Sequence, residues 1–138
     1  MSRPDEALLR LLAYDRRRYW LTNGWCLRFR IKHAPLTEGR PYGISYSFTL
    51  HDVDMTRLLG FDNAHGVPRR RVYDHRHRFR RTDELVPYSY VDADTLLVDF
   101  FDAVETACKA DGVQFDFDTD EVELDEEVEG FDDEDVSE

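Results

Sequence analysis

The sequence predicts an α+β fold in which an antiparallel sheet of four or five strands packs against one C-terminal helix. Two observations predict the sheet: apolar and polar side chains alternate over residues 25–32 and again over residues 42–50, which is the period of a half-buried strand. A third observation predicts the helix, because apolar side chains over residues 93–110 recur at helical spacing. Strands followed by a single long helix favour a sheet that is covered on one face.

The N-terminal part of the chain predicts a short helix and then a hairpin. Residues 5–12 combine good helix formers with acids at the start. Asn23-Gly24 is a strong hairpin signal and predicts a two-residue loop. Such a loop pairs Arg17 with Arg30 and Tyr19 with Arg28, so that one sheet face carries Arg17, Tyr19, Arg28, Arg30 and Lys32. Like charges opposite one another destabilise a sheet, so this face needs a bound anion or screening by solvent and salt.

Three further strands are expected after this hairpin. Residues 42–50 form the second alternating strand, and residues 56–62 form a short one. Residues 72–80 form a polar strand in which His75 and His77 share one face, because alternate residues of a strand point the same way.

The C-terminal helix has clear start and stop signals. Asp92 is suited to cap the helix over residues 93–110, and Gly112 is suited to follow its last turn. The stripe that we expect to face the core comprises Leu96, Leu97, Phe100, Phe101, Val104 and Cys108.

Composition indicates one folded domain. The chain has 138 residues, of which 41% are hydrophobic and 13% aromatic, enough for a modest core. It shows neither an apolar run long enough to span a membrane nor a signal peptide. Cys26 and Cys108 have no metal-ligand spacing, so we expect two buried thiols in a reducing cytoplasm.

Charge divides the chain into two unequal parts. The net charge is −12, yet residues 111–138 hold 15 of the 30 acids and no basic residue, whereas residues 1–110 hold all 18 basic residues and the other 15 acids, a balance of +3. We therefore expect a domain over residues 1–110 and an acidic tail over residues 111–138, of which only the start, around Val113 to Phe117, adds an edge strand. Because 16 of the 18 basic residues are arginine, a salt-adapted, haloarchaeal source is also suggested, and the tail would then serve solvation.

The segment over residues 61–81 indicates a surface that handles phosphodiesters. It contains three histidines and seven arginines. Arginine supplies a forked donor that suits phosphate, and histidine titrates near neutral pH. The competing hypothesis is a solvated basic edge strand. Together with the hairpin, the segment supplies the candidates for nucleic-acid binding, which are Arg17, Arg28, Arg30, Arg69, Arg70, Arg71, Arg76, Arg78 and Arg80.

Three interpretations compete for the histidines of this segment. His75 and His77, with Asp62 or His65, have the residue types of a divalent-metal site, but the arginines would repel a cation, so we expect no metal and no other cofactor. Alternatively, one histidine takes the 2′-hydroxyl proton of RNA, another protonates the leaving oxygen, and an arginine stabilises the phosphorane. The third alternative is binding without chemistry.

The order of these motifs resembles the TumE family of toxins from toxin–antitoxin pairs. The matching features are the Asn-Gly turn, the strand YGISYSFTL (42–50), Arg57 followed by GFDN (60–63), and a loop with His65. After them come DHRH (74–77), PYSY (87–90) and a closing helix with the D-x-x-x-L-L-x-D-F pattern of residues 92–100. The resemblance covers about residues 12–105.

This resemblance implies a toxin that acts on RNA and is held in check by a small helix-turn-helix antitoxin. Together with the chemistry of the histidines and arginines, we expect a ribonuclease. Carried over by position, the functional residues are Asp62, Asn63, His65, His75 and His77. Phe61 stands where the family has tyrosine, and the acidic tail is not part of the pattern. The alternative is a non-catalytic module that binds nucleic acid or protein in transcriptional control. No membrane partner is expected, and the sequence leaves a homodimer open.

Overall fold

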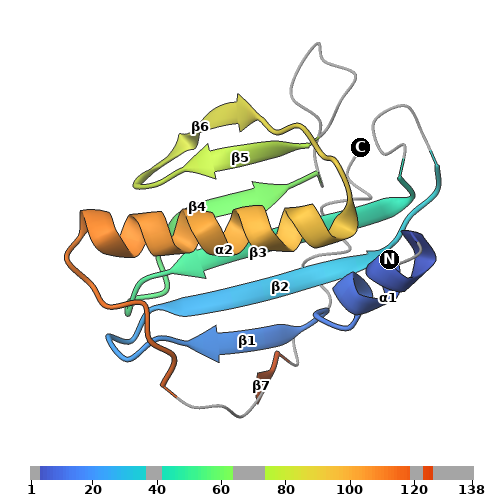
Figure 1. The fold of residues 1–138 in the computed structure, drawn as a ribbon. Coiled ribbons are helices and arrows are strands. Elements are labelled where there is room, and N and C mark those ends of the chain that lie inside the picture. Colours follow the sequence, from blue (N-terminus) through green and yellow to red (C-terminus); the bar gives the residue numbers. More distant parts are fainter. Residues whose placement is uncertain (1–3, 37–41, 64–73, 119–122, 126–138) are drawn as a thin grey trace.

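The structure is a computed structural model that describes residues 4–36, 42–63, 74–118 and 123–125. Its seven described strands form one antiparallel sheet, and a long helix lies across one face of that sheet (Figure 1). The α+β fold is therefore confirmed, but the expected number of four or five strands is wrong.

The sheet is a meander in which each strand pairs with the next along the chain, in the order β6-β5-β4-β3-β2-β1-β7. Only β7 breaks this order, because it returns from the C-terminal tail to pair with β1. The elements in chain order are α1 (Pro4–Leu12), β1 (Arg17–Trp20), β2 (Cys26–His33), β3 (Ile44–His51), β4 (Arg57–Asp62), β5 (His75–Arg78), β6 (Arg81–Pro87), α2 (Ala93–Ala110) and β7 (Glu123–Leu124).

The core lies between α2 and the central strands, as the alternating runs predict. Phe100 of α2 sits at its centre, with ring centroids 5.4 Å from Phe29, 5.6 Å from Phe48 and 5.8 Å from Phe61. All four rings are buried, and each such side chain contributes roughly 2–3 kcal/mol to stability. The predicted helix is confirmed with its cap, because the Asp92 carboxylate accepts a hydrogen bond from the Thr95 amide (2.7 Å).

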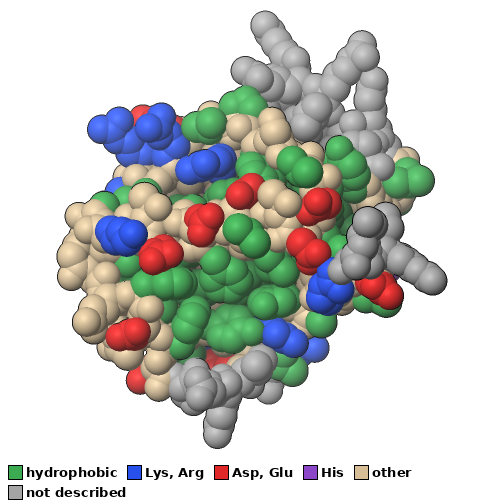
Figure 2. Space-filling model, in the orientation of Figure 1, with side chains coloured by type: hydrophobic (Ala, Val, Ile, Leu, Met, Phe, Trp, Pro, Cys, Tyr) green, Lys and Arg blue, Asp and Glu red, His purple; other side chains and the backbone are tan. Residues whose placement is uncertain are grey.

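The helix covers only part of this face. Figure 2 shows hydrophobic side chains on the sheet beside α2 and acidic side chains along the outer surface of the helix. The partly buried side chains that pack against the core include Tyr14, Tyr19, Leu97 and Phe101.

The register of the first hairpin differs from the prediction by one residue. Tyr19 pairs with Leu27 and Arg18 with Arg28, because the loop has three residues and closes where the Leu21 amide donates to the Trp25 carbonyl (2.8 Å). Gly24 takes a positive φ of 94° in this loop, as three-residue hairpins with a glycine commonly do. A two-residue loop would have turned the buried Leu21 to the sheet face opposite α2, which we call the polar face. Burial of Leu21 therefore selects the longer loop.

The polar strand expected over residues 72–80 is shorter than predicted and is followed by a second strand. β5 ends at Arg78, and the chain reverses through Phe79 and Arg80, where Arg80 adopts a φ of 60°. The returning strand β6 has little apolar alternation and is mostly exposed, so its own sequence did not predict a strand. Its pairing with β5 stabilises the extended conformation of β6, which its composition alone does not favour.

The described residues of the tail touch the sheet edge in two places. Phe117 forms a single bridge with Leu21 instead of the expected edge strand, and β7 pairs with β1 further along. Cys26 and Cys108 are buried free thiols, as expected, and burial raises the pKa of Cys26 to about 11. In the described part of the chain, no helix is both long and apolar enough to cross a bilayer.

Candidate functional site

Asp62, His75 and His77 meet on the sheet face opposite α2, and we call this cluster the Asp62 centre. β4 supplies Asp62 and β5 supplies both histidines. The antiparallel register places His75 directly opposite Asp62, and His77 opposite Gly60. Because alternate residues share a face, the three side chains point the same way. The structure thus brings together the two histidines and the aspartate that the sequence had singled out.

The Asp62 carboxylate bridges the two imidazoles. Its Oδ1 lies 3.0 Å from His75 Nε2 and its Oδ2 lies 2.9 Å from His77 Nε2, while the two ring centroids are 5.0 Å apart. A Cβ at Gly60 would stand 3.7 Å from His77 Cδ2, which is an ordinary van der Waals contact, and its tightest approach would be to the Phe48 carbonyl oxygen at 3.3 Å.

His77 is held at both ends of its ring. Its Nδ1 donates to the carbonyl oxygen of Thr82 on β6 at 2.7 Å, while its Nε2 faces Asp62. A carbonyl and a carboxylate oxygen both only accept hydrogen bonds, so this arrangement suits an imidazolium that carries a proton on each nitrogen.

The Asp62 centre is largely enclosed. The exposed fractions of the side chains are 10% for Asp62, 4% for His75 and 11% for His77. Burial by itself raises the pKa of the Asp62 carboxyl, but hydrogen bonds and positive charge from the two histidines outweigh burial, so that the pKa lies well below its usual range. Asp62 is therefore a carboxylate at neutral pH.

Asn63 has a different environment from its neighbour Asp62. Its side-chain oxygen accepts from the Tyr46 amide (2.9 Å), and its side-chain nitrogen donates to the Ile44 carbonyl (2.9 Å). The buried Tyr46 hydroxyl in turn donates to Asp74 at 2.7 Å. Through these hydrogen bonds, Asn63 holds the end of β4 against β3, beside the Asp62 centre.

Two rows of cross-strand neighbours connect the Asp62 centre with arginines of the hairpin. The first row runs from Arg28 through Thr49 and Gly60 to His77. The second row is the next on the same face and consists of Arg30, Ser47, Asp62 and His75. Three strand spacings separate each arginine from its histidine, about 14 Å.

The one-residue shift of the hairpin changes which arginine of β1 joins this face. Arg18 pairs with Arg28 and extends the first row, and Trp20 lies on the same side two residues on. Arg17 instead lies on the α2 side, with its guanidinium 4.6 Å from the Tyr14 ring centroid and a hydrogen bond to Tyr19. The apolar pattern of Tyr19 and Leu21, matched to that of β2, was the signal that would have identified Arg18.

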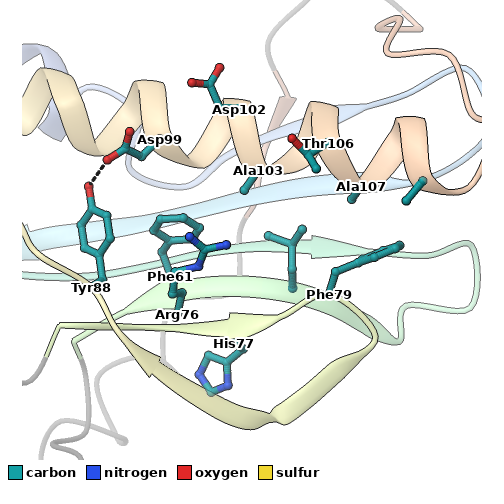
Figure 3. Close-up of a pocket in the computed structure, with 12 residues that line it drawn as sticks. Phe61, Arg76, His77, Phe79, Tyr88, Asp99, Asp102, Ala103, Thr106 and Ala107 are labelled. Atoms are coloured by element: carbon teal, nitrogen blue, oxygen red, sulfur yellow. Dashed lines mark hydrogen bonds between the residues drawn. The ribbon is translucent and has the colours of Figure 1, made fainter.

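Arg76, Arg78 and Arg80 are separated from the Asp62 centre. Arg76 pairs with Phe61 and lies over its ring, 5.3 Å from the centroid, in a cavity of about 440 Å³ between α2 and the sheet. Figure 3 shows Arg76 in this cavity, whereas the His77 ring points away from the helix. Arg78 and Arg80 contact Glu84 (3.8 Å) and Asp111 (2.5 Å).

Four predicted site residues lie outside the described residues. They are His65, Arg69, Arg70 and Arg71.

The Asp62 centre also has the donor set of a metal site. One donor atom from each of its residues lies within 4.8 Å of the others, and the Thr82 carbonyl orients His77 as carbonyls behind metal-binding histidines commonly do. The same atoms are already joined by hydrogen bonds, so a divalent ion would have to replace protons. The centre thus fits either acid–base chemistry or a two-histidine, one-carboxylate ion site.

An α+β protein with a buried cluster of one aspartate and two histidines on the polar face of its sheet is the class that these observations define. The sequence profile of a family described as Toxin TumE matches residues 3–107. The chain therefore belongs to the TumE toxin family and has a toxin role, for which an antitoxin partner is expected. No curated protein and no solved structure matches the chain significantly.

Proposed function

We propose that this toxin acts on RNA as a metal-independent ribonuclease with the Asp62 centre as its catalytic group. The observation that carries the proposal is the Asp62 carboxylate, which holds two imidazoles on the sheet face that also carries Arg28 and Arg30. Paired histidines supply a base and an acid, and arginines supply charge for a phosphate backbone.

The proposed reaction is an internal transfer at one phosphodiester. His75 accepts the 2′-hydroxyl proton, and the 2′-oxygen attacks phosphorus to form a phosphorane. His77 then gives the departing 5′-oxygen its Nε2 proton, which faces Asp62 before RNA binds, so the RNA must replace this hydrogen bond. The products are a 2′,3′-cyclic phosphate and a 5′-hydroxyl end. We assign the acid to His77 because it is the more exposed ring and its two hydrogen bonds suit the protonated form. Asp62 positions both rings and stabilises their charge, as the aspartate of a catalytic triad does.

A second candidate is RNA or protein binding without cleavage, as in a module for transcriptional control. The observation that favours it is the low exposure of His75, whose side chain is only 4% exposed. In that case the Asp62 centre would hold β4 and β5 together, and the arginines alone would contact the ligand. For either candidate, we propose a small helix-turn-helix antitoxin as the partner.

Expression of the full chain in cells without an antitoxin tests the proposal. Wild type should arrest growth, and a His75→Ala/His77→Ala variant should not. His51→Ala is the matched control, because His51 lies on β3, contacts Thr49 and Met55, and is not part of the Asp62 centre. Equal arrest by wild type and the double variant, or arrest by neither, would contradict the proposal.

Purified protein separates cleavage from binding. Wild type should convert an RNA oligonucleotide into fragments with 2′,3′-cyclic phosphate ends, whereas His77→Gln should bind the same RNA without cutting it. Circular dichroism and thermal melting show whether each variant is folded. Binding without fragments by the wild type would favour the second candidate.

A further inference from the structure

The C-terminal tail lies on the arginine row of the polar face. β7 pairs with β1 so that Glu123 is opposite Arg18, next to Arg28 in the same row. The first row therefore runs on from the Asp62 centre through the arginines to an acid of the tail. This contact is unexpected for a segment whose charge is explained by solvation alone.

Two acids of the tail contact three side chains of this surface. Glu123 Oε1 accepts from Arg18 Nε (2.9 Å) and from the indole Nε1 of Trp20 (3.0 Å). Asp125 forms an ion pair with Arg28. Alternate residues of a strand lie about 6.6 Å apart on one face. Glu123 and Asp125 therefore place two successive negative charges beside Arg18 and Arg28, as two phosphates of a nucleic-acid strand would.

Asp125 is anchored more firmly than a surface ion pair. It is only 3% exposed, its amide donates to the Arg16 carbonyl at 2.6 Å, and its own carbonyl accepts from Arg16 Nε at 2.8 Å. Exposed ion pairs hold chains together weakly, whereas a buried carboxylate between backbone hydrogen bonds defines a position.

The tail leaves part of this surface unsatisfied. The buried Nε of Arg28 has no hydrogen-bond partner among the described residues, although the guanidinium contacts Asp125. A buried donor without a partner is unfavourable, and a phosphate carries more acceptor oxygens than a carboxylate. Trp20 adds an aromatic ring beside Arg18, whose guanidinium carbon lies 5.7 Å from the ring centroid, and aromatic rings stack on nucleic-acid bases.

We propose that Arg18, Trp20 and Arg28 form a binding site for single-stranded RNA, and that Glu123 and Asp125 occupy it in cis as a competitor of that RNA. The site rests on the proposed function, since it would hold the strand whose next part reaches the Asp62 centre along the first row. RNA and the tail exclude one another there, because the phosphates need the same guanidinium donors. A tethered competitor acts at an effective concentration in the millimolar range, so the tail lowers RNA affinity without blocking folding.

The test uses full-length protein and a fluorescent 12-nucleotide oligouridine, titrated at low salt. Glu123→Gln/Asp125→Asn should bind it about tenfold more tightly than wild type. The matched control is Asp116→Asn/Asp118→Asn, which also removes two negative charges from the tail. Both side chains are exposed, and these residues bond to Thr22 and Trp20 only through backbone groups among the described contacts. Equal tightening by both double variants would show general charge repulsion and overturn the proposal.

A second pair of variants tests the arginine site itself, in the Glu123→Gln/Asp125→Asn background. Arg18→Ala should weaken oligouridine binding and flatten its salt dependence, whereas Arg17→Ala, the adjacent arginine on the α2 side, should not. Equal loss from both would overturn the site. The proposal also fails if no variant binds the RNA or if the indole N–H signal of Trp20 does not shift when RNA binds.

These outcomes are separate from those of the proposed function. The His75→Ala/His77→Ala variant can lose growth arrest while the tail variant keeps wild-type RNA affinity. That result would contradict the tail competitor and still support the ribonuclease. Tighter RNA binding by the tail variant, with growth arrest that does not depend on the histidines, would have the opposite meaning.

Discussion

His77 on β5 is the cross-strand neighbour of Gly60 on β4, and its ring extends past this position to the carboxylate of Asp62. A side chain at position 60 would occupy the same face as the imidazole. The glycine therefore lies on the face of the Asp62 centre, next to His77, although it carries no functional group.

Replacing Gly60 with alanine should perturb this geometry. The new Cβ would lie 3.3 Å from the Phe48 carbonyl oxygen, 3.4 Å from Thr49 Cγ2 and 3.7 Å from His77 Cδ2. The approach to the Phe48 carbonyl is tighter than an ordinary contact, and relieving it shifts β4, which carries Asp62. We therefore expect a loss of about 1–2 kcal/mol of stability in urea denaturation and weaker growth arrest.

Gly112→Ala is the matched control for this change. Gly112 has a φ of 68°, and a Cβ at this position would meet no atom within 4 Å. The substitution should therefore cost about 1–2 kcal/mol through backbone strain alone and leave the Asp62 centre untouched. If both variants lose growth arrest equally, general destabilisation explains the effect and Gly60 has no special part in the centre.

Asp62→Asn should destabilise the protein at neutral pH by about 3 kcal/mol, because it removes the carboxylate that two buried rings face and hydrogen-bond. The pH dependence follows from the lowered pKa of Asp62. A carboxyl whose pKa falls on folding stabilises the protein fully above its unfolded pKa of about 3.9, and that stability disappears as the pH falls toward the folded pKa.

Urea denaturation of wild type and Asp62→Asn from pH 7 down to pH 2 measures this difference. The gap between the two unfolding free energies should be constant near neutrality and should shrink only below about pH 4. A gap that is already closed at pH 5 would show that Asp62 is not held as a carboxylate by the histidines.

The sequence predicted the parts of this protein whose signals are local. The alternation of β2 and β3, the Asp92 cap and the stripe around Phe100 each depend on residues close together in the chain, and all are observed. The shared face of His75 and His77 followed from strand geometry alone. Their pairing with Asp62 was open, because Asp62 or His65 fitted the pattern equally well.

What the sequence did not predict depends on contacts between distant residues. One extra residue in the loop before Trp25 exchanged Arg17 for Arg18 on the polar face, and only the burial of Leu21 decides between the two registers. β6 and β7 are ordered by their partner strands rather than by their own composition. The carbonyl of Thr82 that orients His77 has no sequence signature at all.

The response of RNA cleavage to metal ions distinguishes proton transfer from metal-dependent hydrolysis. If the Asp62 centre works by transferring protons, cleavage of an RNA oligonucleotide should be unchanged in excess EDTA. Added zinc should inhibit it, because the ion would take the ring nitrogens that face Asp62, whose donor atoms lie within 4.8 Å of one another. Zinc should also lose this inhibitory effect when binding competes with protons at lower pH. Activity that EDTA abolishes and that a divalent ion restores would instead assign the centre to metal-dependent hydrolysis and would overturn the acid–base roles of His75 and His77.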